Sequence, residues 1–289
     1  MSWRIVVISS RCKLDLSMNY MVVRGEGNKR VSLNEIAVLI LENNAVSMTG
    51  CLLSALIEKK IRIILCDSKR NPQAEVVPYY GCHNDALKIK MQLQWDSFMK
   101  ECIWTKIVTK KIENQAILLR KEDHEEAELL EQYVEQIQPG DVTNREGHAA
   151  KVYFNALFGK KFSRDDDENV INAALNYGYS LILSAVNREV TANGYLTQLG
   201  LWHDNQFNHF NLSCDIMEPL RIIVDEYVVQ HPLSEFSVDE KHQIVTILNQ
   251  TVRINNTEQN LMNAIKIYVK SIFDALNEQS IEMVRFVEI

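Results

Sequence analysis

The sequence predicts an α+β fold, in which a small β-rich N-terminal domain of β-sandwich-like character precedes a larger all-α C-terminal domain. Up to about residue 70, short runs of Val, Ile, Leu and aromatic residues alternate with polar or glycine-containing turns, which is the spacing of strands. Beyond about residue 84, apolar residues recur at steps of three and four, as they do along amphipathic helices.

The expected elements of the N-terminal domain are short. Thr49 is a suitable N-cap for a helix over residues 50–58, because its hydroxyl can accept from the N–H groups of the first turn. Gly25 and Gly27 predict a turn. The strands are expected at residues 3–8, 12–16, 20–23, 37–41 and 61–66.

A polar stretch ends this region. Charged residues, Asn and Pro between Asp67 and Gly81 predict a linker rather than further regular structure. We therefore expect a β-rich domain over residues 1–75, a linker over 76–83 and a helical domain over 84–289.

In the helical domain, one amphipathic helix is expected to start at the cap Asn84 and to continue to about Ile107. The acidic segment 121–138 is most simply a second helix with a solvated face. Residues 169–188 are apolar around most of a helical circumference, so this helix should be the buried axis of the domain. Its Gly178 should allow another helix to pack closely.

The composition limits the classes of function. A net charge of −7 argues against a protein that simply coats nucleic acid, so any DNA contact must come from local basic patches, metal ions or a basic partner. We expect a cytoplasmic, soluble protein with no membrane association, because no signal peptide and no long uncharged apolar run is present. The six cysteines form no C-x-x-C pair and are expected to be reduced.

Glu146 is the first informative carboxylate. In a helix that starts near Asn144, it shares a side with Ala149, Ala150 and Tyr153, which is the packed side. An ionised carboxylate on such a side needs a cation or hydrogen-bond donors. Two alternatives stay open here: a metal ion, or an ordinary salt bridge to an Arg or Lys of a neighbouring helix.

A second group of candidates lies between residues 199 and 221. Asp215 and Glu218 are three residues apart and share a helical face, and Pro219 is tolerated only if that helix has just begun. Both acids should then lie in or beside the first turn, where the helix dipole stabilises carboxylates. A polar loop follows His203 and could fold its imidazole back over the helix start. One His with two carboxylates makes a plausible divalent-metal site.

Four ordered motifs give the sequence a specific resemblance. They are R-E-G-x-A-A-x-x-Y-F from Arg145, N-A-x-L-N-Y-G-Y from Asn172, G-x-x-H ending at His203, and D-x-M-E-P-x-R from Asp215. Together they resemble the CRISPR-associated integrase/endonuclease family of spacer acquisition, the universal first Cas protein. The amino-acid sequence around Asp215 is most similar to that of members from type II-A systems. The resemblance spans essentially the whole chain.

The resemblance implies that Glu146, His203 and Glu218 bind the metal and carry catalysis. Asp215 occupies a family acid position as well, where it either orients His203 through a hydrogen bond or serves as an additional ligand. Many relatives carry Asp in place of Glu218, which leaves the coordination distance and the metal preference open. One imidazole and two carboxylates favour Mn²⁺ or Mg²⁺, and the nitrogen ligand favours Mn²⁺.

The implied reaction inserts short DNA fragments, the spacers, into a CRISPR repeat array. The 3′-OH of a prespacer duplex attacks a phosphodiester at the edge of a repeat, and the metal offsets charge on the oxygens. The implied partners are double-stranded DNA, a second copy of the chain that pairs through the N-terminal domain, and a dimer of a small companion Cas protein that completes a hetero-hexamer. Type II-A relatives also work with an accessory protein and the effector nuclease.

Two other classes of function compete with this interpretation. In one, the chain is a non-catalytic helical DNA-binding or scaffold protein whose Glu146, His203 and Glu218 only pair with arginines such as Arg221. In the other, it is a metal-dependent hydrolase of a small substrate, which would act without DNA or a partner.

Overall fold

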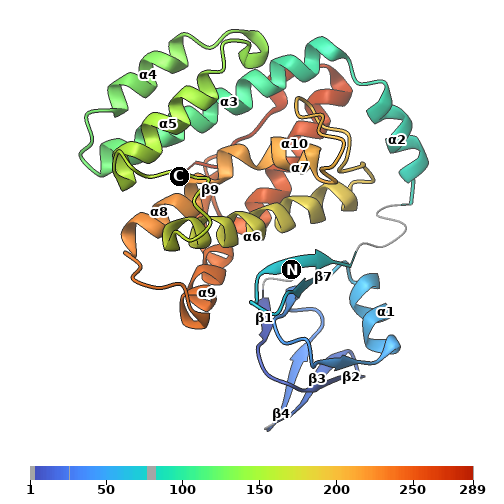
Figure 1. Cartoon of the computed structure of the whole chain (residues 1–289). Helices are drawn as coiled ribbons and strands as arrows, with labels where there is room; N and C mark the ends of the chain where they lie inside the picture. Colours follow the sequence, from blue (N-terminus) through green and yellow to red (C-terminus); the bar gives the residue numbers. More distant parts are fainter. Residues whose placement is uncertain (1–3, 26, 77–82, 289) are drawn as a thin grey trace. The chain divides into compact units, whose positions relative to one another are not determined.

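The computed structural model describes residues 4–25, 27–76 and 83–288 and divides the chain into two compact units, Met1–Gly81 and Cys82–Ile289 (Figure 1). Most of the expected linker, residues 76–83, lies outside the described residues, so its limits stay a prediction. Among the residues that the structure describes, no helix has the length and hydrophobicity of a membrane span.

The described residues of the first unit form two four-stranded sheets and one helix. In the first sheet, β1, β5 and β7 are parallel and β8 is antiparallel to β7; in the second, β3 is antiparallel to both of its neighbours. The expected strands and the helix are confirmed, with Thr49 accepting from the Leu52 N–H. The elements are β1 (Arg4–Ile8), β2 (Lys13–Ser17), β3 (Tyr20–Gly25), β4 (Gly27–Ser32), β5 (Ile36–Leu41), β6 (Ser47–Met48), α1 (Gly50–Glu58), β7 (Arg62–Cys66) and β8 (Pro72–Glu75).

One hydrophobic core serves both sheets. All six residues of β5 are buried, as expected for the centre of a parallel sheet. Leu39 of this strand belongs to the same cluster as Leu14 of the second sheet and Leu52 of α1. The β-sandwich-like arrangement itself stays a prediction. The prediction that residues from Asp67 onward form only a linker was wrong at β8. This edge strand pairs with β7, with Ala74 opposite Leu65.

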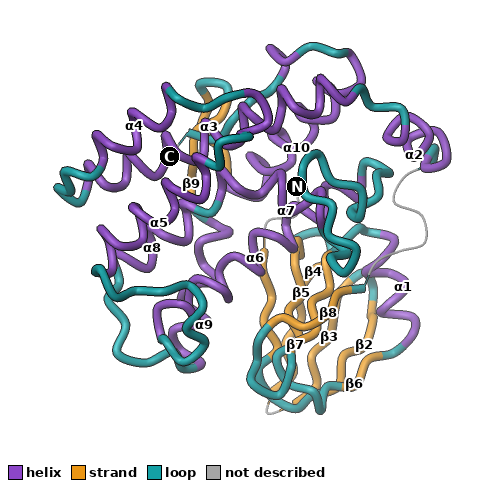
Figure 2. The backbone as a smooth tube through the Cα atoms, turned by 45° about the horizontal axis from the view of Figure 1, so that its top comes forward, coloured by secondary structure: helices purple, strands orange, loops and turns teal. Residues whose placement is uncertain are grey.

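The second unit is mainly helical (Figure 2). Its α-helices are α2 (Asp85–Leu93), α3 (Ser97–Lys121), α4 (Ala127–Glu135), α5 (Arg145–Phe158), α6 (Val170–Ala192), α7 (Asn211–Met217), α8 (Ile222–Gln230), α9 (Val238–Val245) and α10 (Leu261–Glu278). Short 3₁₀ helices are η1 (Pro139–Asp141), η2 (Glu218–Leu220), η3 (Thr246–Asn249) and η4 (Ile281–Met283), and strands β9 (Thr251–Ile254) and β10 (Thr257–Asn260) form a hairpin. The prediction of an all-α domain was wrong at this hairpin, whose Asn255 and Asn256 take the positive φ that such turns require.

Helix α6 is the buried axis, as expected, and packs against α7, α8, α9 and α10. A Cβ at Gly178 would lie 2.3 Å from a methyl carbon of Val224, so only glycine lets α8 approach this closely. The single helix expected from Asn84 to Ile107 is instead two. Asp96 separates them because its carboxylate accepts from the Met99 N–H and caps α3.

Candidate active site

Glu146 stands in the first turn of α5, where the sequence predicted it. Two side chains build this helix start. Asn144 adopts left-handed backbone angles and accepts from the Gly147 N–H, and Asp141 accepts from the N–H groups of Arg145 and Glu146 at 2.7 and 2.9 Å. The caps hold the Glu146 backbone, so its side chain leaves the helix in a fixed direction.

Glu218 lies at the junction between α7 and η2 and is buried. The prediction that a helix has just begun before Pro219 was wrong. Helix α7 ends at Met217, and Pro219 falls in the short 3₁₀ turn that follows. Arg221, one turn further on, donates both Nε and Nη2 to the two Glu218 oxygens at 2.9 Å. This paired geometry is the strongest that an arginine and a carboxylate can form.

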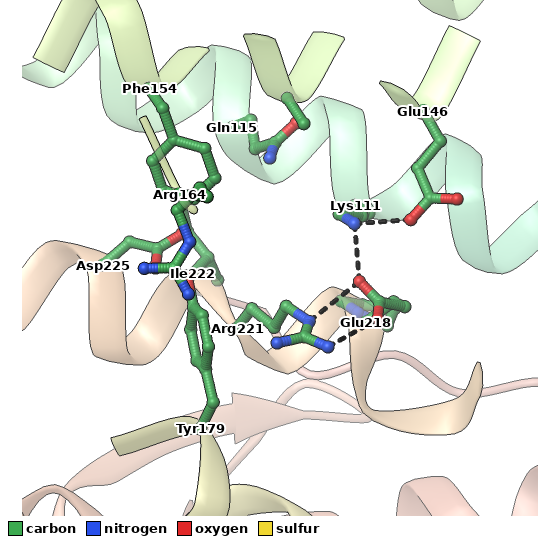
Figure 3. A pocket seen from close by; sticks show the side chains of 12 residues that line it. Lys111, Gln115, Glu146, Phe154, Arg164, Tyr179, Glu218, Arg221, Ile222 and Asp225 are labelled. Atoms are coloured by element: carbon green, nitrogen blue, oxygen red, sulfur yellow. Dashed lines mark hydrogen bonds and ion pairs between the residues drawn. The ribbon is translucent and has the colours of Figure 1, made fainter. Parts of the chain in front are cut away.

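Lys111 of α3 joins the two glutamates. Its Nζ donates to Glu146 Oε1 at 2.6 Å and to Glu218 Oε2 at 2.5 Å (Figure 3). Burial would lower the pKa of this lysine, but the Glu218 and Glu146 carboxylates outweigh burial and raise it above its ordinary value. Burial likewise opposes charge on Glu218, yet Arg221 and Lys111 lower its pKa to about 2. Glu218 is therefore held as a carboxylate beside two cations, Lys111 and Arg221.

Asp215 holds the loop that carries His203. The fully buried carboxylate accepts from the backbone N–H groups of Leu201, Trp202 and His203, and it also bonds to Nδ1 of the His203 ring. A Cβ at Gly200 would lie 2.8 Å from Asp215 Oδ2 and closer still to the His203 carbonyl, so the loop closes over the carboxylate only with glycine there.

The His203 imidazole is fixed but remains accessible. Its side chain is 46% exposed, and its ring packs edge-on against Trp104. The hydrogen bond that His203 donates to the Asp215 carboxylate raises the pKa of His203; burial opposes this rise, and the Glu146 and Glu218 carboxylates contribute to it. With Nδ1 engaged by Asp215, Nε2 is the ring nitrogen left to bind another group.

The structure thus brings Glu146 and Glu218 together through one lysine. Both carboxylates are close enough to His203 to help raise its pKa. In the part of the chain that the structure describes, no three His, Cys, Asp or Glu side chains are gathered tightly enough to hold a metal ion. The salt-bridge alternative for Glu146 is therefore what the structure shows, and the metal role of the three residues stays a prediction.

The donor set nevertheless fits the implied Mn²⁺ or Mg²⁺. Two carboxylates from different elements already face one shared cation, the Lys111 ammonium, which shows that their arrangement suits a positive group. The held imidazole beside them supplies a nitrogen donor with a fixed tautomer. Glu146, His203 and Glu218 are the residues that would hold the ion.

A cavity of about 280 Å³ opens beside the cluster and is lined by residues of α3, α5, α6 and α8. At its far end Asp225 accepts from the hydroxyls of Tyr153 and Tyr179. Arg164 also lines the cavity, where it stacks over Tyr179 and donates to Asn172 and Asn176. Figure 3 shows its guanidinium between the rings of Phe154 and Tyr179.

Lys111 was missed by the sequence reasoning, although a signal was present. It occupies the same helical row as the buried residues Trp104, Val108, Gln115 and Leu118, at steps of three and four. A lysine in the middle of a buried row needs an acidic partner, just as Glu146 needs a basic one.

The fold and site define a protein of two units whose helical unit holds a buried and a part-buried glutamate, joined by one lysine, near a fixed imidazole. The chain belongs to the family described as CRISPR associated protein Cas1, whose model matches residues 5–233. It is 33% identical to the CRISPR-associated endonuclease Cas1 of Neisseria meningitidis serogroup C (strain 8013), over 100% of this chain and 97% of that protein.

Solved structures share the fold at lower identity. A casposase bound to integration product matches with a TM-score of 0.79 and 17% identity, covering 97% of this chain and 92% of that chain. A chain of a Cas6-RT-Cas1–Cas2 complex matches with a TM-score of 0.78 and 18% identity, over 99% of this chain and 36% of that longer one.

Proposed function

We propose that this protein is a metal-dependent DNA integrase and endonuclease that inserts spacers into a CRISPR repeat array. The observation that carries the proposal is the pair of glutamates, the part-buried Glu146 and the buried Glu218, that face one shared cation near a fixed imidazole. Membership of the Cas1 family supports it, as does the fold shared with a casposase bound to integration product.

In the proposed reaction, the oxygen of a DNA 3′-OH forms a bond to phosphorus and the P–O3′ bond of the target strand breaks, leaving a new 3′-OH there. The metal supplies charge stabilisation at the phosphate. Glu146, His203 and Glu218 hold that metal, and Asp215 fixes the His203 ring. Arg221, a member of the cluster, and Arg164, at the far end of the cavity, both line it with positive charge, in a chain whose net charge is −7.

The proposed partners follow from the relatives. We infer binding of prespacer and repeat duplexes, a homodimer formed through the N-terminal unit, and a hexamer with a small companion protein, since a solved complex contains Cas1 together with Cas2. A type II-A origin, with its accessory protein and effector nuclease, and a cytoplasmic location belong to the same proposal.

One observation favours a second candidate, the non-catalytic scaffold. Both Glu146 and Glu218 already have basic partners, Lys111 and Arg221, so neither needs a metal to be stable. An ion-pair network with a purely structural role would show the same pairing of each glutamate with a basic side chain.

DNA joining separates the two functions. Folded Glu146→Gln and His203→Ala proteins, bound to the companion protein, should join a labelled prespacer to repeat DNA at least about a thousandfold more slowly than the unaltered protein. A chelator should abolish joining, and Mn²⁺ should restore it. The matched control is Glu131→Gln, which removes an exposed glutamate that is also ion-paired. Undiminished joining by both site variants would show that Glu146 and His203 carry no catalysis and only form ion pairs, as the scaffold alternative requires.

A further inference from the structure

Lys111 holds the position of a cation between the two glutamates that the proposed function assigns to a metal. Its Nζ bonds to one oxygen of each, and its side chain is only 12% exposed. An ammonium ion and a divalent ion compete for the same pair of carboxylates, because two cations held this close together repel each other strongly in a poorly hydrated site.

The charge balance points the same way. Glu146 and Glu218 are matched by Lys111 and Arg221, so the cluster is neutral as it stands. Arg221 bonds to Glu218 alone, whereas Lys111 is the group that bridges both acids. A divalent ion added without any loss would leave two surplus positive charges in a buried cluster. Departure of the bridging ammonium reduces that surplus from two charges to one and frees one oxygen of each glutamate.

We propose that Lys111 is a built-in competitor of the metal: it keeps Glu146 and Glu218 paired in the metal-free protein, and metal binding displaces its ammonium from both carboxylates. This inference rests on the proposed function. It assigns Lys111 as a positioning residue that sets the metal affinity and couples metal binding to movement of a positive side chain that lines the cavity.

Calorimetry with Mn²⁺ alone, on the full-length protein without DNA, tests the affinity. Lys111→Met removes the ammonium but keeps an unbranched side chain, and should bind Mn²⁺ about tenfold more tightly or better, since charged hydrogen bonds no longer compete. Lys111→Arg keeps the competitor and should bind no more tightly than the unaltered protein. The control is Lys110→Met, whose lysine pairs with Glu113 outside the cluster and should leave the affinity unchanged.

A second measurement needs no substitution. In the unaltered protein, acetylation of lysines by an N-hydroxysuccinimide ester is followed by mass spectrometry of peptides with and without saturating Mn²⁺. Lys111 should react slowly without metal and at least about fivefold faster with it, because a displaced amine loses its two acidic partners. Lys110 in the same peptide region is the internal standard and should not change.

The outcomes distinguish this inference from the proposed function. Equal or weaker Mn²⁺ binding by Lys111→Met, or unchanged acetylation of Lys111 when Mn²⁺ is bound, would overturn the competitor role while leaving the metal site intact. Failure of both the unaltered protein and Lys111→Met to bind Mn²⁺ would instead remove the metal site, and with it the proposed function.

Discussion

Glu218 and Asp225 are two buried acids on the same short stretch of chain, but their hydrogen-bond partners differ and their pKa values are shifted in opposite directions. Both line the same cavity, with residue exposures of 5% and 2%. Glu218 has two cationic partners, which lower its pKa to about 2. Burial instead raises the pKa of Asp225 to about 6, although the hydroxyls of Tyr179 and Tyr153 and the charge of Arg221 oppose that rise.

The difference shows how neighbours decide what a buried carboxylate can do. Glu218 is kept fully charged and is therefore ready to hold a cation. Asp225 is bound by neutral hydroxyls from α5 and α6 while it belongs to α8 itself, so it ties three walls of the cavity together. We interpret the first as part of the reaction machinery and the second as part of its support.

The largest expected effect contrasts these two acids directly. Glu218→Gln should reduce DNA joining at least about a thousandfold, because one of the charged metal-binding groups is lost. Asp225→Asn, which keeps size and polarity, should reduce it about tenfold or less. Both rates are measured with labelled prespacer and repeat DNA after circular dichroism has shown that the variants fold. Similar losses of joining rate from the two substitutions would contradict the proposal that Glu218 takes part in the reaction and Asp225 only supports the cavity.

A third buried acid sharpens the contrast. Asp215→Ala should reduce joining about tenfold to a hundredfold, because the loop and the His203 ring lose the carboxylate that orients them. Mn²⁺ affinity, measured by calorimetry, should fall by a similar factor. Asp204→Ala, in the same loop but exposed, serves as the control. Unchanged affinity would mean that His203 takes no part in metal binding.

The raised pKa of Asp225 also predicts a pH effect on stability. The folded protein holds this proton more tightly than the unfolded chain, so the associated stability is complete below about pH 4 and is lost as the pH rises through about 6. The free energy of unfolding should therefore fall, relative to Asp225→Asn, by on the order of 2 kcal/mol between about pH 4 and about pH 7.

Urea unfolding at several pH values measures this difference, with the exposed pair member Asp274→Asn as the control. If the free energy of unfolding changed with pH in the same way for the unaltered protein and Asp225→Asn, burial would not raise the pKa of Asp225.

The smallest expected effect concerns the start of α5. Asp141→Ala removes the acceptor for two N–H groups, including that of Glu146, and should lower the free energy of unfolding by about 1 kcal/mol. Thermal unfolding checks this value. Joining should fall only modestly, because Asn144 still caps the helix. A loss as large as that of Glu218→Gln would show that Asp141 does more than hold the backbone.

Much of this arrangement could be predicted from sequence, because it depends on local signals. The spacing of apolar residues around Glu146 and the cap at Asn144 located α5, and Gly178 correctly indicated a close helix contact. The strands β1, β2, β3, β5 and β7 of the first unit were found from their apolar runs, whereas the polar β4 and the short β6 were not predicted. The expected hydrogen bond between Asp215 and His203 is present, since the two residues lie on one short loop and the helix that follows it.

The parts that escaped prediction depend on partners distant in the chain. Nothing near Lys111 in the sequence indicates that Glu146 and Glu218 will meet it, because α3, α5 and the α7–η2 junction come together only in the folded unit. Strand β8 exists because β7 offers it a free edge. The break between α2 and α3 was hidden because apolar residues continue through it in helical register.

The bridge through Lys111 has a consequence for synthesis and turnover. Its three members lie on widely separated segments, so the emerging polypeptide carries no assembled centre until the segment holding Glu218 has joined the earlier helices. A chain that ends before Glu218 likewise lacks one of the two acids. Under the proposed function, a fragment of this protein would leave the cell's DNA uncut.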